Sequence, residues 1–373
     1  MQQRGPKSHH KLVLFARYNN FARLTILALA LASAGAGCNI VKKESKTPTL
    51  LKTENASMDQ LVGEVNRFAR VNSMRAKMDL KFEDDSFAQF GSKEVYRSAD
   101  GEVVVQRPGK ILLKVQAPII KTDIAQMTSD GETFRVAILN DGGSGKYKKF
   151  VKGTNKADYS RLQKDLGVSD LDSNKMTRAS VNSFANLRPQ HFTDALLVRP
   201  TDAGKMYLQS TVFQVEEDET QKTKSPLRKV MRGYYLLDEI TRRDDGSLHV
   251  ERRFWFDRVG GIRLARQQIF DQAGEIESDI TYGREGTLTS TSEYTNLPLM
   301  IRVTRPRERY TMSLTYQTPD AVSIGKTYPD AAFVLQNTWQ LEEIDLDKKL
   351  KDAVAAADAA RDETNKALQR QPQ

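Results

Sequence analysis

Apolar and polar residues alternate one by one over most of residues 74–316. Successive side chains of a β-strand point to opposite faces, so this period of two predicts strands with one dry face and one wet face. One such run is Lys110–Gln116, in which Ile111, Leu113 and Val115 fall on the same face. We expect these three side chains to point into the protein. Burial on one face only is typical of antiparallel sheets.

Turn signals rich in aspartate and glycine separate these runs, as expected for a meander. They are Asp100-Gly101, Asp130-Gly131, Asp141-Gly142-Gly143, Asp245-Gly246 and Gly274. Their spacing predicts about ten or eleven strands. The expected fold class is therefore mainly β (α+β), built on an incomplete, strongly curved antiparallel β-barrel.

Two helices are predicted beside the strands. Ser57 and Gln60 form a capping box ahead of an apolar stripe at three-four spacing, so one amphipathic helix should open the domain. Pro189 should begin a short apolar helix that Pro200 ends. One helix at the start and one midway through the meander are expected to cover the open mouth of the curved sheet.

The N-terminal segment has the organisation of an export signal. Residues 1–37 hold five of the 57 basic residues and no acidic one, and Leu24–Gly37 is uncharged and mostly apolar. The only cysteine of the chain, Cys38, follows directly. This arrangement resembles a bacterial lipoprotein signal, which implies cleavage before Cys38 and acylation of its thiol. An uncleaved membrane anchor and simple secretion are the alternatives.

The rest of the chain divides by composition. A flexible, lipid-anchored stalk is expected over residues 38–55, the barrel domain over 56–340, and a charged, alanine-rich tail, partly helical or disordered, over 341–373. A polar, weakly patterned insertion covers residues 154–183. The residue after the cysteine is Asn39. An aspartate at this place would favour the inner membrane, so we expect the protein to be anchored in the outer membrane and to face the periplasm.

The residues that catalysis and metal binding need are scarce. Beyond the signal the chain has two histidines, His191 and His249, with no histidine or cysteine at ligand spacing. We predict that each is a surface or strand residue, that the chain holds no metal or cofactor, and that it is not an enzyme. Without residues 1–37 the chain keeps 52 basic and 48 acidic residues, a net charge of +4 without a basic stripe, which argues against nucleic acid.

Three strand endings carry a family resemblance. One strand ends in Arg107-Pro108, a second ends in a turn at Pro118, and a third ends in Asp130-Gly131 before an aromatic residue. This pattern resembles the LolA/LolB-type lipoprotein carriers of Gram-negative bacteria. The later runs Phe256–Leu264 and Asp271–Glu275 are similar to the second half of those carriers.

The resemblance implies an incomplete barrel with a helical lid and a hydrophobic cavity that receives acyl groups. Arg107 matches an arginine that helps to hold the lid; the alternative is an ordinary arginine at a strand end. Pro118, Ile119 and Ile120 match a turn whose apolar residue enters the membrane, a role that falls to Ile119. Two isoleucines at a turn could equally lie under a neighbouring loop.

The expected function is non-catalytic binding of lipoproteins or lipids and their transfer or insertion at the outer membrane. Lipoprotein acyl chains or lipids are the expected ligands, and a periplasmic carrier or another envelope protein is a further partner. A fully packed barrel without a cavity is the simpler alternative for the fold. The rival function is that of a structural, assembly or sensor lipoprotein that binds another envelope protein.

Overall fold

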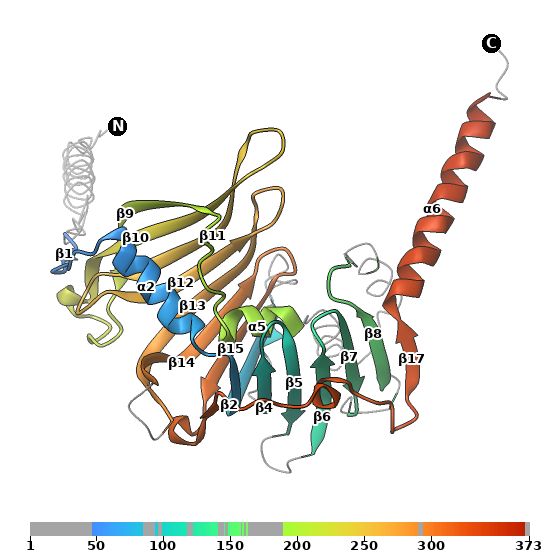
Figure 1. Ribbon diagram of the computed structural model, residues 1–373, viewed down its shortest axis with the longest axis horizontal. Coiled ribbons are helices and arrows are strands. Elements are labelled where there is room, and N and C mark those ends of the chain that lie inside the picture. The colour runs from blue at the N-terminus through green and yellow to red at the C-terminus, as the bar shows by residue number, and fades with distance from the viewer. Residues whose placement is uncertain are drawn as a thin grey trace, which may run out of the picture.

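The computed structural model describes residues 47–84, 94–95, 99–117, 122–140, 145, 148–157, 159, 162, 189–289 and 294–369. Within these residues, seventeen strands join in one sheet that curves but does not close (Figure 1). The first nine strands are β1 (Thr49–Leu50), β2 (Ser73–Asp84), β3 (Glu94–Val95), β4 (Ala99–Gln106), β5 (Lys110–Gln116), β6 (Asp123–Ser129), β7 (Thr133–Ile138), β8 (Lys149–Thr154) and β9 (Met206–Glu217). The others are β10 (Lys229–Arg242), β11 (Leu248–Asp257), β12 (Arg263–Phe270), β13 (Ile276–Leu288), β14 (Tyr294–Arg305), β15 (Tyr310–Tyr316), β16 (Ser323–Ile324) and β17 (Glu342–Asp345).

Two antiparallel meanders make up the sheet. In chain order, the first meander runs from β2 to β8, with β3 as a short side pairing of β2, and the second runs from β9 to β15. The pairing of β15 with β2 joins the two meanders. The predicted fold class is confirmed, although fourteen described strands lie between Ser73 and Tyr316 instead of about ten or eleven.

Three of the predicted turns are present. Gly131, Gly246 and Gly274 end hairpins with φ of 105°, 84° and 84°, values that glycine adopts most readily. The turn predicted at Asp100-Gly101 is wrong, because both residues lie inside β4. A Cβ at Gly101 would lie 2.7 Å from Leu80 Cδ1, so this glycine makes room for a side chain of the neighbouring strand. The turn predicted at 141–143 lies outside the described residues.

Both predicted helices exist and lie on the same face of the sheet (Figure 1). Helix α2 (Met58–Ala69) begins with the expected capping box, in which Ser57 N–H donates to Gln60 Oε1 at 2.8 Å. Its buried side chains are Leu61, Val65 and Phe68. Helix α5 (Pro189–Leu196) begins at its predicted proline. We call the sheet face that carries these helices the inner face.

The chain after the second meander covers part of the opposite, outer face. Residues 325–341 run across β4 to β6, and we call them the strap. Leu335 N–H donates to Thr128 Oγ1 at 3.0 Å, and Phe333 in the short helix η4 (Asp330–Phe333) is fully buried. The strap leads to β17, which pairs in parallel with β8.

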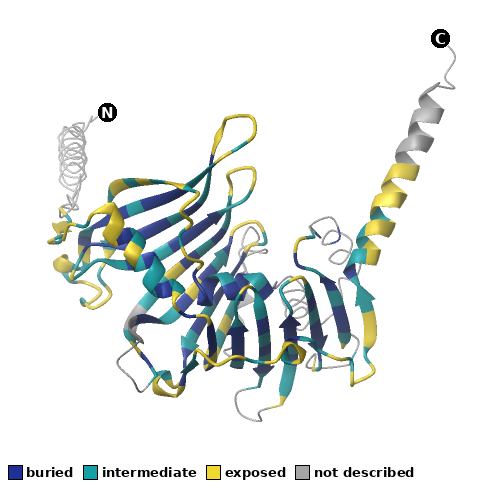
Figure 2. Ribbon diagram, in the orientation of Figure 1, coloured by how far each residue is buried: buried dark blue, intermediate teal, exposed yellow. Residues whose placement is uncertain are grey.

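A long helix follows β17 at the C-terminal end of the described chain. Helix α6 (Leu346–Gln369) projects from the β17 edge of the sheet, and its described side chains are mostly exposed beyond its first turn (Figure 2). Of the helices in the described part of the chain, none combines the length and apolar character needed to span a bilayer. The first residues of the tail, 342–345, belong to the sheet as β17.

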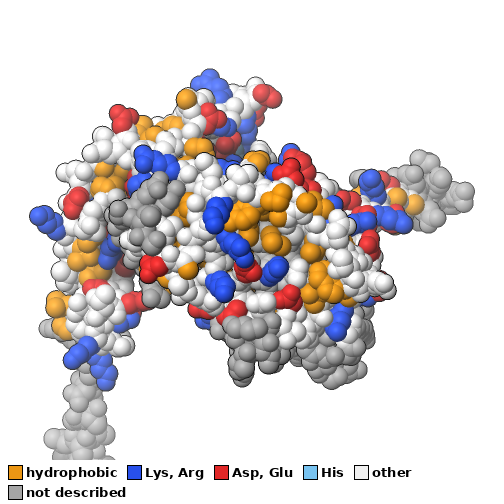
Figure 3. All heavy atoms as spheres, turned by 60° about the horizontal axis from the view of Figure 1, so that its bottom comes forward, with side chains coloured by type: hydrophobic (Ala, Val, Ile, Leu, Met, Phe, Trp, Pro, Cys, Tyr) orange, Lys and Arg blue, Asp and Glu red, His pale blue; other side chains and the backbone are white. Residues whose placement is uncertain are grey.

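The outer face of the second meander is polar and ion-paired. Arg253 binds Asp238 at 2.6 Å across β10 and β11, and Arg266 binds Asp279 across β12 and β13. Trp255 Nε1 donates to Gln268 Oε1 at 2.9 Å. Figure 3 shows another face, on which basic and acidic side chains are intermixed with hydrophobic patches. The outer face of β10 to β13 is therefore polar, as the alternation predicts, whereas the strap buries part of the outer face of β4 to β6.

Candidate functional site

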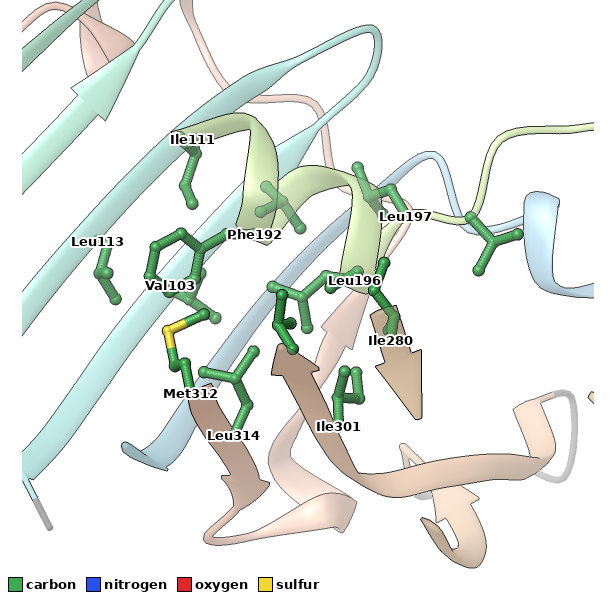
Figure 4. Close-up of a cluster of buried hydrophobic side chains, with 14 of the residues drawn as sticks. Val103, Ile111, Leu113, Phe192, Leu196, Leu197, Ile280, Ile301, Met312 and Leu314 are labelled. Carbon is green, nitrogen blue, oxygen red and sulfur yellow. The ribbon is translucent and has the colours of Figure 1, made fainter. Parts of the chain in front are cut away.

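The inner face is covered at its centre by helix α5. Phe192 is 1% exposed and lies against Ile111 and Leu113 of β5 in the buried cluster (Figure 4). Leu196, one turn further along, lies beside Ile280 of β13 (Figure 4). The helix contacts β4, β5 and β6 on one side and β14 on the other. This single eight-residue helix thus packs against strands of both meanders at the centre of the inner face.

The three strand residues predicted to point inward do so. Ile111, Leu113 and Val115 are 0%, 2% and 3% exposed, and all belong to the cluster that includes α5. Between them, Leu112 and Lys114 are half-buried on the other face. The structure therefore places this strand directly under helix α5.

Helix α5 also makes polar contacts with the sheet. His191 Nδ1 lies 2.6 Å from Tyr310 Oη of β15, and Tyr282 Oη of β13 donates to Ala195 O at 3.4 Å. The prediction that His191 is a surface or strand residue is wrong, because it is buried in a helix that the sheet surrounds. The prediction for His249 is confirmed, since it lies in β11.

Arg107 connects the ends of both helices to the sheet. It follows β4 directly, and its guanidinium donates four hydrogen bonds to backbone carbonyls, at distances from 2.6 to 3.3 Å. Ala69 and Val71 at the end of α2 supply two of these carbonyls, and Leu197 and Val198 at the end of α5 supply the others. Carbonyls at a helix C-terminus have no partner within the helix, and a cation is well suited to them.

A second arginine holds the segment that follows α5. Arg252 of β11 donates to Arg199 O and Pro200 O at 2.9 Å each, and its other bonds go to the Glu239 carboxylate of β10 at 2.8 and 2.5 Å. Both side chains of this ion pair are buried. Tyr207 also donates to Glu239, and burial and this bond raise the pKa of Tyr207 to about 12.

The motifs of the sequence do not single out this second arginine. Arg252 and Glu239 sit in strands whose alternation would place apolar residues at inward positions, so the pair breaks the pattern. A charged residue at an inward position of a strand is the signal that would have found it, since such a charge needs a buried partner. Burial lowers the pKa of Arg107, and the nearby charges of Arg199 and Arg252 lower it further.

Asp194 is the charged residue of α5 itself. Its side chain is 29% exposed, and its Oδ1 lies 3.6 Å from Arg199 Nε. Burial raises the pKa of Asp194, and the negative charge of Glu277 adds to this, while Arg199, Arg252 and Arg305 oppose it. Its place near the helix C-terminus is also unfavourable for an anion. We therefore expect the ionised form of Asp194 to weaken the packing of α5 on the sheet.

We predict that Asp194→Asn stabilises the protein at neutral pH. A folded-state pKa above the unfolded one makes a stabilising contribution that is complete below the unfolded pKa and is lost as pH rises through the folded pKa. The amide stays neutral, so its advantage over the wild type should shrink as the pH falls. Urea midpoints over a pH series measure this difference.

The control variant for this prediction should change stability in the opposite direction. Hydrogen bonds from Ser247 lower the pKa of Asp245 in the exposed β10–β11 hairpin, so Asp245→Asn should lose stability at neutral pH. A pH-independent advantage of the Asp194→Asn chain would contradict the assignment of its effect to ionisation.

Several predicted features lie outside the described residues. They are Cys38, the turn Pro118-Ile119-Ile120 and nearly all of the insertion at 154–183. In the part of the chain that the structure does describe, no group of three or more histidine, cysteine, aspartate or glutamate side chains is arranged to hold a metal ion.

Comparisons by sequence find no relative: no family model matches the chain, and no curated protein matches it. Solved structures do resemble the chain, and three of them share 9–10% identity with it. A LolA superfamily protein from Nitrosomonas europaea has a TM-score of 0.39, with 75% of this chain and 99% of that chain covered. A DUF1329 family protein from Desulfovibrio piger also gives 0.39, covering 74% and 95%. A domain described as an outer membrane lipoprotein-sorting protein, from Vibrio parahaemolyticus, gives 0.37, covering 73% and 94%.

Proposed function

We propose that this chain is a non-catalytic carrier that binds acyl chains of lipoproteins or lipids on its inner face and passes them to the outer membrane. The observation that carries the proposal is helix α5, an apolar helix laid on the inner face of an open sheet. The end of this helix is held by the guanidinium of Arg107. If α5 moves aside as a lid, Phe192 and Leu196 leave an apolar surface for an acyl chain.

The driving force would be the burial of methylene groups. Each methylene removed from water contributes about 0.8 kcal/mol, so affinity should rise with acyl chain length until the inner face is filled. The lid must lose its own apolar contacts first, which sets a threshold length below which no chain binds. No covalent step is needed for this binding and transfer.

Mass spectrometry of lipids that copurify with the full chain is the direct test. The protein is extracted in detergent, freed of bulk lipid, denatured, and its bound lipids are identified. We expect lipid or lipoprotein acyl species in a fixed ratio to protein. A preparation that retains no acyl species and takes up none from added phospholipid vesicles would show a packed core and end the proposal.

Arg107→Ala should make the lid easier to open. Loss of four charge-assisted hydrogen bonds leaves the carbonyls at the ends of both helices without this donor, so exchange of a bound fluorescent fatty acid should quicken about tenfold or more. The matched control is Arg253→Ala, which removes an arginine from the outer face. Equal exchange rates in the two variants would show that Arg107 does not control the opening of the lid.

We also propose that Cys38 is the lipid anchor and that Ile119 enters the membrane. On this view Ile119→Glu should slow transfer of a lipidated cargo into outer-membrane vesicles severalfold, because a carboxylate is costly to insert into a bilayer. Cargo binding and the unfolding midpoint should not change. A Cys38→Ser chain, which should leave the membrane fraction, gives the reference for loss of the anchor. Unaltered transfer by the Ile119→Glu chain would exclude the turn from delivery.

The projecting helix α6 favours the rival function, a structural or assembly lipoprotein. Its 24 residues leave the β17 edge with most described side chains exposed, as in an element that meets another protein. Removing residues 354–373 distinguishes the two functions. A carrier should keep its lipid content after this truncation, whereas an assembly protein should lose the envelope protein that copurifies with the full chain.

A further inference from the structure

One end of the second meander lies close to the start of the described chain. Strand β1 pairs in parallel with the first residues of β10, with Thr49 opposite Val230, and the β9–β10 hairpin turns just before them (Figure 1). We call residues 47–54 and 213–231 the β1 end. The described chain begins at Thr47, nine residues after Cys38, a stretch that spans at most about 30 Å when fully extended. A membrane that holds Cys38 therefore lies near the β1 end.

Apolar side chains are exposed at the β1 end. Leu50 of β1, Met231 of β10 and Val215 of β9 lie directly opposite one another across three strands, so they form one row on one face of the sheet. Leu50 is 63% exposed and Val215 is 50% exposed. Phe213, on the same face of β9, continues the row and is 48% exposed. A contiguous group of exposed apolar residues marks a surface that meets a protein or a membrane.

The β9–β10 hairpin adds a further leucine and several lysines to this end. Leu227, in the short helix η2 (Pro226–Arg228), is 58% exposed. The exposed lysines of the β1 end form no ion pair within the described part of the chain, and they are Lys52, Lys222, Lys224 and Lys229. Lysines beside exposed apolar residues are typical of surfaces that lie on a bilayer, because their alkyl stems follow apolar surface while their ammonium groups reach the headgroups.

Most acidic side chains of the β1 end are engaged within the protein. Glu216 and Glu217 pair with arginines of β10 and η2, at 3.5 and 2.8 Å. Asp218 accepts hydrogen bonds within its own turn. Glu54 and Glu219 are the exposed acidic residues of this end without such a partner, against the four exposed lysines. The unpaired charge of the β1 end is therefore mainly positive, which favours contact with anionic lipid headgroups.

We propose that the β1 end lies on the membrane that holds the lipid anchor and makes a second contact there with anionic phospholipid. Leu50 and Leu227 enter the boundary between headgroups and acyl chains, and the lysines bind phosphate groups. This inference rests on acylation of Cys38, which is part of the proposed function. A flexible stretch of nine residues has an average end-to-end distance of about 15–20 Å, so the anchor keeps the bilayer close to this surface.

The opposite end of β10 supplies a matched control position. Leu248, in the β10–β11 hairpin, is 59% exposed, almost the same as Leu227. The fourteen residues of β10 separate the two hairpins by about 40 Å. Each leucine can be replaced by a single reporter cysteine, because Cys38 is the only cysteine of the chain and acylation blocks its thiol.

Fluorescence quenching in vesicles tests the contact in the full chain. Leu227→Cys and Leu248→Cys chains carry an environment-sensitive fluorophore and are held by their lipid anchor in vesicles of phosphatidylethanolamine and phosphatidylglycerol that contain a shallow spin-labelled lipid. We expect quenching that is severalfold stronger in the Leu227→Cys chain, with blue-shifted emission in that chain alone.

Three results would overturn the proposal. Equal quenching in the two chains would exclude the membrane contact and leave the anchor intact. Blue-shifted emission without quenching in the Leu227→Cys chain would assign the surface to a covering protein segment, such as the stalk. A wild-type chain that takes up the fluorophore at Cys38 would remove the anchor, and the contact with it.

Charge reversal tests the role of the lysines. Each lysine near an anionic surface strengthens binding about fivefold, so Lys222→Glu with Lys224→Glu should lower the quenching of the Leu227→Cys chain severalfold. The control is Lys348→Glu with Lys349→Glu, a pair of exposed lysines on the projecting helix α6, which should leave the quenching unchanged. Circular dichroism should be the same in all chains. Quenching that is equal in the two double variants would exclude the anionic headgroups as partners of this end.

Discussion

Replacing Arg252 by methionine is expected to cost about 3–5 kcal/mol of stability, because it leaves the buried carboxylate of Glu239 without its counter-charge. The replacement also removes the donors to Arg199 O and Pro200 O, which hold the segment after α5. Tyr207 would still donate a hydrogen bond to Glu239, at 2.7 Å. Urea unfolding of the full chain measures the loss.

Its neighbour Arg253 supplies the control. Arg253 pairs with Asp238 on the outer face and is 32% exposed, so Arg253→Met should cost about 1 kcal/mol or less. Restoring neutrality with a second change, Glu239→Gln, should recover part of the loss in the Arg252→Met chain, since no buried charge then remains. Similar losses of stability in the two single variants would mean that the buried Arg252–Glu239 pair contributes no more to stability than the partly exposed Arg253–Asp238 pair.

Phe192→Ala is the second change with a large expected effect. Truncating a fully buried phenylalanine typically costs about 3–5 kcal/mol, through lost transfer energy and the cavity that remains. Here the cavity would open between α5 and strand β5, where Ile111 and Leu113 line it. Leu248→Ala, at a side chain that is 59% exposed in a hairpin, should change the unfolding midpoint little.

The same substitution bears on the lid. If α5 detaches as a unit, its amide hydrogens should exchange with an opening free energy well below that of β11 and β12, which open only on global unfolding. Phe192→Ala should lower both opening free energies by a similar amount and keep this difference. Equal opening free energies for α5 and the two strands would show that the helix and the sheet unfold together, and the helix would then be part of the core and not a lid. The two outcomes separate a carrier from a packed protein without any lipid present.

Local sequence signals located most of the secondary structure. The capping box of α2 and the proline that begins α5 involve residues within one turn of each other, so their meaning does not depend on the rest of the fold. The inward placement of Ile111, Leu113 and Val115 follows from strand geometry alone. The turn predicted at Asp100-Gly101 was wrong for the opposite reason, because only Leu80 of the neighbouring strand explains why a glycine stands there.

The candidate site was predictable only in part. Arg107 was found through a family resemblance, whereas the Arg252–Glu239 pair and the burial of His191 were found only in the structure. Charged residues at inward strand positions look like errors in the alternation until the partner strand is known. Their partners come from β10, β15 and the segment after α5, which no local pattern connects.

By itself the sequence determined the antiparallel strands, their dry face, the two helices and the separate N-terminal signal pattern, because each depends on neighbours along the chain. Tertiary structure alone decided that α5 covers the centre of the inner face and that β17 and β9 form the two edges of the sheet. It also decided that Arg107 reaches Val198 across 91 residues of sequence. Such contacts are chosen by packing and by the need to satisfy buried polar groups, and those requirements exist only once distant segments meet.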